Sequence, residues 1–202
     1  MVYIAVAGLI LIGIAFAVWK LLQRSQSNPS NTIQVETATN KSNEKPRNNA
    51  FNEMRNRALT FPSEQFEIEH QTATPIVYGV VMDWNLGEGT ATFVSFMSGD
   101  ASMYTSTGGG VIGGVGHENV RKASIQFMKK GQNFVSKAQR SDDLSLPNSN
   151  SVKFFLLTTQ GRFVAEERLH NFDNGSSQWL DLFEEANKVI TELRAISGDF
   201  EK

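Results

Sequence analysis

An uninterrupted apolar run at the start of the chain constrains its fold more than any other stretch. Residues 2–22 contain no charged side chain before Lys20. As a helix rising 1.5 Å per residue, the run would be about 30 Å long, which matches the hydrocarbon core of a bilayer. Tyr3 and Trp19 lie near its two ends, where amphipathic rings favour the membrane interface. We therefore predict a single membrane-spanning anchor at residues 1–22.

Two other interpretations of this run stay open. One is a signal peptide cleaved after Ala15-Phe16-Ala17, which would leave a secreted soluble protein, although no Lys or Arg precedes the run as a signal peptide requires. The other is a buried core helix, although the run is apolar on every side and polar sequence follows it. For the anchor, Lys20 and Arg24 follow the run, and the positive-inside rule then places the C-terminal domain in the cytoplasm.

The next segment, residues 23–49, has almost no apolar side chain. It cannot offset the entropy lost on ordering, so we predict a disordered linker with a root-mean-square span of about 30 Å. Residues 50–202 then form one globular domain. The chain has a formal net charge of -2, which gives no electrostatic reason to expect a nucleic-acid partner. It contains no cysteine, so disulfide usage does not indicate its compartment.

Hydrophobic periodicity predicts the elements of this domain. Helical spacing marks residues 50–60, 117–138 and 177–196, and β-branched or aromatic runs mark strands at 76–84, 90–97, 101–106, 152–159 and 162–169. The unbroken Phe-Phe-Leu-Leu at 154–157 is typical of a central strand buried on both faces. Consecutive hairpins favour a mostly antiparallel five-stranded sheet. The two long helices, one basic and one acidic, would lie side by side on one face, which makes a two-layer α+β domain.

This order of elements resembles roadblock and profilin-like regulatory domains, which also lay helices against an antiparallel sheet. The resemblance concerns the fold and implies no function. A second resemblance comes from residues 100–118, which read Asp-Ala-Ser-Met-Tyr-Thr-Ser-Thr-Gly-Gly-Gly-Val-Ile-Gly-Gly-Val-Gly-His-Glu. This segment is similar to one found in a family of small uncharacterised bacterial proteins, with the pattern D-A-S-x-Y-x-S-x-G-G-G-x-I-G-G. That resemblance implies no known activity.

One interpretation of this glycine-rich segment is a ligand or partner site. Glycine admits positive φ and lets the backbone approach a ligand closely, and the free N–H groups of the following helix would hold a phosphate or carboxylate. The candidate residues are Thr105, Ser106, Gly108, Gly109, Gly110, Gly113, Gly114, His117 and Arg121. Against an anion site, the acidic Glu118 lies in the first turn of that helix, where it would repel an anion.

The nucleotide-binding motifs are also incomplete. Gly108, Gly110 and Gly113 satisfy G-x-G-x-x-G, but neither a βαβ unit nor a Gly-Lys-Ser/Thr end accompanies them. The alternative interpretation is structural. The glycines would permit a tight crossing of strand, loop and helix, with Val111 and Ile112 packed into the core.

Other chemistry is sparse in the sequence. The three histidines, His70, His117 and His170, are far apart and show no metal-binding spacing, and there is neither a cysteine nucleophile nor a G-x-S-x-G motif. We therefore expect no catalytic residues, no metal and no cofactor. The predicted function is a membrane-anchored, non-catalytic module that binds a protein partner or forms a homodimer. The alternatives are an anion- or nucleotide-binding or hydrolytic domain that uses the Gly108–His117 loop, and a secreted soluble protein.

Overall fold

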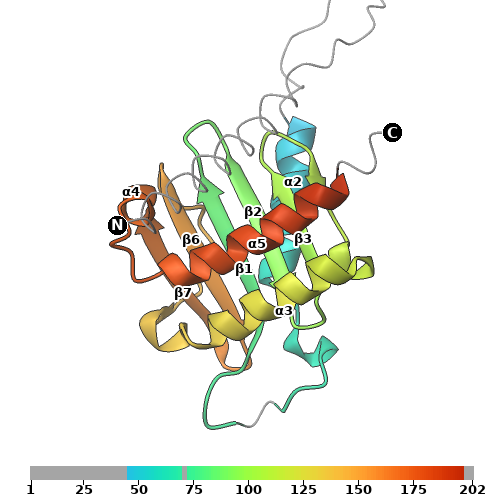
Figure 1. Ribbon diagram of the computed structural model, residues 1–202, viewed down its shortest axis with the longest axis vertical. Helices are drawn as coiled ribbons and strands as arrows, with labels where there is room; N and C mark the ends of the chain where they lie inside the picture. Colours follow the sequence, from blue (N-terminus) through green and yellow to red (C-terminus); the bar gives the residue numbers. More distant parts are fainter. Residues whose placement is uncertain (1–44, 70–71, 198–202) are drawn as a thin grey trace, which may run out of the picture.

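The computed structural model describes residues 45–69 and 72–197, which are organised around one antiparallel sheet (Figure 1). The strand order is β4-β3-β2-β1-β6-β7-β5. The strands are β1 (Val77–Asn85), β2 (Thr90–Phe96), β3 (Ala101–Thr105), β4 (Gly110–Val111), β5 (Gln139–Arg140), β6 (Ser151–Thr158) and β7 (Gly161–Arg168). The prediction of an α+β domain with an antiparallel sheet is confirmed.

The prediction of five strands is wrong, because the sheet has 7 strands. The two additional strands, β4 and β5, are two residues long and form the two edges of the sheet. Gly110 of β4 pairs with Tyr104 of β3, and Gln139 of β5 pairs with Val164 of β7. Two residues cannot show an alternating hydrophobic pattern, so the sequence carries no signal for them. Short edge strands also leave few unpaired backbone groups for other chains to join.

The helices are α2 (Lys45–Leu59), α3 (Glu118–Gln132), α4 (Leu169–Asp173) and α5 (Leu180–Ser197), with 3-10 turns at η1 (Ser63–Gln65), η2 (Gly114–Gly116) and η3 (Val135–Lys137). Helix α3 ends earlier than the predicted residue 138. It stops because Phe134 turns into the core, where its ring centroid lies 5.3 Å from that of Trp179. Helix α4 has only five residues, too few to show helical periodicity.

Helices α3 and α5 lie side by side on one face of the sheet, in front of the strands in Figure 1. Glycine allows α3 to approach β1 closely, because a Cβ on Gly131 would lie 2.9 Å from Val80 Cγ2. The expected pairing of a basic with an acidic helix is confirmed by Lys130 Nζ, which lies 2.9 Å from Asp181 Oδ2. Because this ion pair is largely exposed, it contributes little stability, and packing holds the two helices together.

The opposite face of the sheet is also covered, which the predicted two-layer arrangement omits. Helix α2 lies behind the sheet in Figure 1 and packs on it together with nearby loop residues. This second cluster consists of Phe51, Ala58, Leu59, Tyr78, Val81, Val94, Tyr104, Phe155 and Leu157, with Phe66, Phe96 and Leu144 packed against it. Every residue of β6 is buried, which confirms the prediction of a central strand.

The beginning of the chain falls mostly outside the described residues. The predicted anchor at 1–22 and linker residues 23–44 are not among them. Helix α2 begins at Lys45, so residues 45–49 are helical rather than part of the linker. A polar stretch without apolar side chains carries no amphipathic pattern, which is why the sequence placed the boundary later. Within 45–69 and 72–197, no helix combines the length and the apolar character needed to cross a membrane.

Candidate functional site

The predicted glycine-rich site connects β3 to α3 at the β4 edge of the sheet. Its hydroxyl groups close their own turn. Thr105 Oγ1 donates to the Gly108 carbonyl oxygen at 2.7 Å, and Ser106 Oγ accepts from the Thr90 backbone N–H at 3.0 Å. The Thr105 N–H donates to the Gly109 carbonyl oxygen at 3.1 Å. The structure therefore brings these candidates together as a compact turn whose polar groups bind one another.

Two of the candidate glycines are required by close packing. A Cβ on Gly110 would clash with the Met103 carbonyl oxygen on the paired strand β3. A Cβ on Gly114 would lie 2.6 Å from Val120 Cγ1 in α3. Both positions therefore favour the structural interpretation, in which glycine permits a tight crossing of strand, loop and helix.

The remaining candidate glycines set the path of the loop. Gly108, Gly109 and Gly113 have φ of 100°, 88° and 80°, a region that side-chain-bearing residues rarely adopt. A Cβ on Gly109 or Gly113 would meet no atom within 4 Å, so the turn geometry demands glycine there and packing does not.

The two apolar residues of this segment have different environments. Val111 packs against the core, but Ile112 is 68% exposed, so the expectation that Ile112 is buried is wrong. Successive residues of an extended chain point in opposite directions, and at this edge the outward direction is uncovered. Val115, three residues on, is 46% exposed. The segment thus presents two apolar side chains to solvent from a closely packed base.

The last two candidates lie at the start of α3. His117 is the N-terminal cap residue, and its side chain makes no capping hydrogen bond. The side chain of Arg121 lies against Gly99 in the β2–β3 turn, away from the glycine run. Glu118 binds Lys122 at 2.7 Å, and this hydrogen bond lowers the pKa of the Glu118 carboxyl. Thus Arg121 and the Thr105 turn do not converge on one point.

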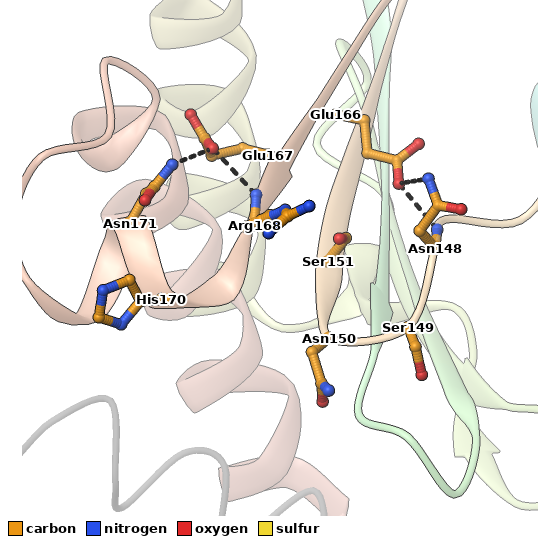
Figure 2. Close-up of a pocket in the computed structure, with 9 residues that line it drawn as sticks. All are labelled: Asn148, Ser149, Asn150, Ser151, Glu166, Glu167, Arg168, His170 and Asn171. Atoms are coloured by element: carbon orange, nitrogen blue, oxygen red, sulfur yellow. Dashed lines mark hydrogen bonds between the residues drawn. The ribbon is translucent and has the colours of Figure 1, made fainter.

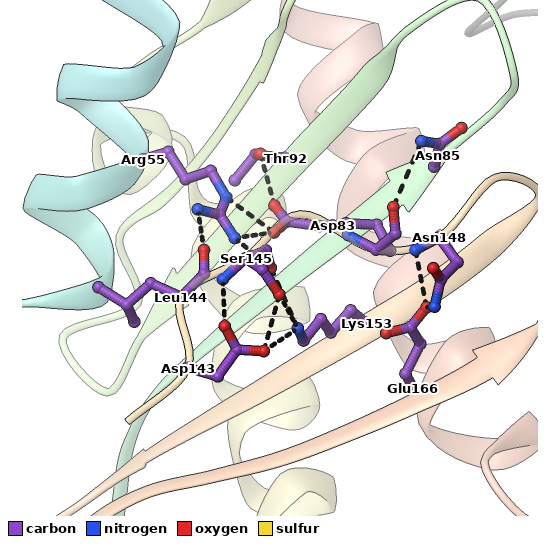
Figure 3. A network of polar contacts seen from close by, with 11 residues as sticks. Arg55, Asp83, Asn85, Thr92, Asp143, Leu144, Ser145, Asn148, Lys153 and Glu166 are labelled. Atoms are coloured by element: carbon purple, nitrogen blue, oxygen red, sulfur yellow. Dashed lines mark hydrogen bonds and ion pairs between the residues drawn. The ribbon is translucent and has the colours of Figure 1, made fainter. Parts of the chain in front are cut away.

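A polar row that sequence reasoning missed crosses the sheet face that α2 covers, and Figure 3 shows four of its members, Thr92, Asp83, Lys153 and Glu166. Strand register places one polar residue from each of five neighbouring strands in line: Tyr104, Thr92, Asp83, Lys153 and Glu166. Asp83 and Lys153 are the charged residues of otherwise uncharged, almost entirely buried strands, whereas Glu166 belongs to a partly exposed strand that carries other charges. A buried polar residue in a central strand is the available signal, but only register shows that the five are neighbours.

Helix α2 contributes an arginine to this row. Arg55 Nε donates to Asp83 Oδ2 at 2.8 Å, and Arg55 Nη2 lies 2.6 Å from the same oxygen. The other carboxylate oxygen accepts from Thr92 Oγ1 at 2.6 Å. The side chains of Arg55 and Asp83 are 5% and 0% exposed, so the pair is removed from water. Burial raises the pKa of the Asp83 carboxyl, while Arg55 and Thr92 pull that pKa back down.

A loop at residues 141–147 lies beside Asp83 and contacts both Arg55 and Lys153. Lys153 Nζ donates to Asp143 Oδ2 and to Ser145 Oγ, both at 2.9 Å. Asp143 also accepts from the Ser145 backbone N–H at 2.8 Å. The hydrogen bonds from Ser145, followed by the one from Lys153, hold the pKa of Asp143 well below its usual range. The loop is therefore fastened to β6 by charge-assisted hydrogen bonds.

One member of the row is unsatisfied. The Tyr104 hydroxyl is buried and has no hydrogen-bond partner among the described residues. Its ring packs edge-on against Phe51 of α2, with centroids 6.0 Å apart. Burial, and then the nearby Asp83 carboxylate, raise the pKa of Tyr104. A buried hydroxyl without a partner is costly, so this position is a weakness in the contact between α2 and the sheet.

An open hollow of about 800 Å³ lies near the beginning of β6 and the end of β7 (Figure 2). Its lining is polar: Asn148, Ser149, Asn150, Ser151, Glu166, Glu167, Arg168, His170 and Asn171. The two acidic side chains bind neighbours within the lining. Glu166 accepts from the Asn148 backbone N–H at 2.7 Å, and Glu167 accepts from Asn171 Nδ2 at 2.6 Å.

Neither a search for metal-binding groups nor a comparison with known proteins assigns a function. Within 45–69 and 72–197, no group of three or more His, Cys, Asp or Glu side chains is placed to hold a metal ion. No family model, no curated protein and no solved structure matches the chain.

Proposed function

We propose that this chain is a membrane-anchored, non-catalytic interaction module that binds a protein partner or a second copy through its glycine-rich segment. The observation that carries this proposal is the exposure of two apolar side chains three residues apart in the chain, Ile112 at 68% and Val115 at 46%. Transfer of such a side chain from water into an interface is worth about 1.5–3 kcal/mol. Together the two would form the apolar centre of a small contact.

The base that presents these side chains also supports the proposal. Gly110 and Gly114 are packed against β3 and α3 without room for a Cβ, and Thr105 closes the turn. A segment held in this way loses little conformational entropy on binding. Within the polar row, by contrast, Asp83 is buried and bound by Arg55 and Thr92, which favours a structural role over chemistry at Asp83.

The membrane anchor is supported by the composition of residues 2–22 alone. Centrifugation of cell lysate at high speed without detergent tests it, and we expect the full-length chain in the membrane pellet. Full-length, unprocessed chain in the supernatant would contradict the anchor. Sequencing of the N-terminus tests cleavage, because a secreted form would begin after Ala17.

Site-specific photo-crosslinking tests the contact surface. A photoreactive amino acid is placed at Ile112 or, as the matched control, at Leu146, which is 42% exposed in the 141–147 loop. We expect one defined adduct from position 112, which is absent from position 146 and is lost with Val115→Asp. An adduct of twice the chain mass would identify a second copy. The same adducts from both positions, or none from position 112, would contradict the proposal.

A further inference from the structure

The sheet face beneath α2 contains a complete set of acceptors for a guanidinium group, which we call the guanidinium cradle. It consists of the Asp83 carboxylate and the Leu144 and Ser145 carbonyl oxygens (Figure 3), together with the Phe155 ring. Arg55 Nη1 donates to Leu144 at 2.7 Å, Nη2 donates to Ser145 at 3.3 Å, and Cζ lies 5.4 Å from the ring centroid. Planar, forked recognition of this kind selects arginine over lysine.

The guanidinium cradle is built without α2. Asp83 belongs to β1, Phe155 to β6, and the two carbonyl groups to the 141–147 loop. Thr92 fixes the orientation of the Asp83 carboxylate, and Lys153 fastens the loop at Asp143 and Ser145. The acceptors are therefore held in place by the sheet and its loop. Helix α2 supplies the guanidinium group and apolar side chains of the cluster against which Leu144 packs.

The attachment of α2 is confined to one stripe of the helix. Phe51, Arg55 and Leu59, spaced four residues apart, are buried, together with Ala58. The intervening Asn52, Glu53, Asn56 and Arg57 are exposed. Residues beyond the helix are held to the sheet separately, because Tyr78 Oη donates to the Phe61 carbonyl oxygen at 2.9 Å. Release of α2 with the following residues in place would require a backbone change at Thr60 and loss of the hydrogen bond from Arg162 Nη1 to the Leu59 carbonyl oxygen.

The unpartnered Tyr104 hydroxyl indicates that α2 does not satisfy every polar group on this sheet face. The hydroxyl is buried beside Phe51 of α2, and α2 offers it no acceptor. Strand register places Tyr104 beside Thr92 and Thr92 beside Asp83, so Tyr104 lies in line with the guanidinium cradle, two strands from Asp83. A helix that brings an acceptor to this position would satisfy a group that α2 leaves buried and unpaired.

We propose that the guanidinium cradle is a binding site for an arginine-bearing amphipathic helix of a protein partner, and that α2 is the internal ligand that closes it. The partner helix presents its arginine with apolar residues four positions before and four after, which is the pattern of Phe51, Arg55 and Leu59. The guanidinium cradle lies on the sheet face opposite α3 and α5, so this proposal does not depend on the exposed Ile112. Displacement of α2 opens it.

Peptide exchange in the full-length chain tests this. The probe is a fluorescent peptide of residues 45–60, and the chain carries Arg55→Ala, which weakens the internal ligand. We expect the Arg55→Ala chain to bind this peptide about tenfold more tightly than the wild-type chain does. The Arg55→Ala chain should also bind a peptide that itself carries Arg55→Ala about tenfold more weakly than the unaltered peptide. A peptide with Arg57→Ala is the matched control and should bind like the unaltered one. Fluorescence anisotropy gives the affinities.

Three results would overturn the proposal of a protein partner, and the first two are as follows. One is a folded Arg55→Ala chain, with unchanged circular dichroism, that binds both peptides equally or not at all. The other comes from hydrogen exchange of the wild-type chain, so the test remains decisive even if the Arg55→Ala variant does not fold. If α2 is displaceable, its amide hydrogens exchange by local opening, faster than the amide hydrogens of β1 and β6. Equal protection of α2 and β6 would show that the helix leaves only on global unfolding. Exchange of α2 between two wild-type chains, trapped as a crosslinked dimer, would assign the site to a second copy instead of a partner.

Discussion

Removal of the buried arginine gives the sharpest test of how α2 is held. Arg55→Ala leaves the Asp83 carboxylate, which is 0% exposed, without its principal counter-charge. Loss of one member of a buried ion pair costs about 3–5 kcal/mol, because the other charge stays buried and unpaired. Thr92 still donates to Asp83, and Lys153 is the adjacent residue on β6. We therefore expect the lower end of that range, a loss of about 3 kcal/mol in the free energy of unfolding.

The pH dependence of this loss follows from the direction of the pKa shift. Burial raises the pKa of Asp83 above its ordinary 3.8, and Arg55 opposes that rise. Without Arg55 the folded-state pKa rises further, so the folded variant favours the protonated carboxyl. A group with a raised folded-state pKa stabilises fully below its unfolded pKa and loses that contribution as pH rises through the folded pKa. The deficit of the variant is therefore smallest near about pH 4 and grows toward about pH 7.

Urea unfolding of the full-length chain in a non-ionic detergent measures this deficit, with fluorescence of the buried Trp84 and Trp179 as the signal. Arg57→Ala, on the exposed side of the same helix, is the matched control and should change the free energy of unfolding by less than about 0.5 kcal/mol. A deficit for Arg55→Ala below about 1 kcal/mol would be typical of an exposed pair and would refute the reasoning. A deficit that does not change with pH would refute the assignment to Asp83.

Three further predictions concern the contacts of α3 and α5. Gly114→Ala should lower stability by about 1–3 kcal/mol, because its Cβ would lie 2.6 Å from Val120 Cγ1, whereas Gly116→Ala, with no atom within 4 Å, should leave the thermal midpoint nearly unchanged. Gly131→Ala improves helix propensity by about 1 kcal/mol. We nevertheless expect a lower free energy of unfolding in urea, because the added Cβ would press on the buried strand β1. A higher free energy of unfolding would show that β1 can shift to accept the Cβ. Asp181→Asn should cost less than about 1 kcal/mol in the same assay, because its ion pair to α3 is largely exposed, and a larger loss would show that this pair holds the helices together.

Several features were determined by the sequence alone. The strands and long helices follow from hydrophobic periodicity, which is carried by consecutive residues and needs no knowledge of the rest of the chain. The glycines at 108, 109 and 113 mark a turn with positive φ, as their lack of a Cβ implies. The buried character of β6 was readable from four consecutive apolar residues, because only a strand covered on both faces tolerates such a run.

Tertiary structure alone decided the rest. The polar row requires strand register, since a shift of one residue would move Asp83 or Lys153 to the other face. Strands β4 and β5 exist because a neighbouring strand offers unpaired backbone groups to two residues that have no pattern of their own. The exposure of Ile112 depends on its lying at an uncovered edge, where an apolar residue has no core to enter. Arg55 shows the same limit: its partners come from β1 and a distant loop, and only the folded chain brings them around one guanidinium group.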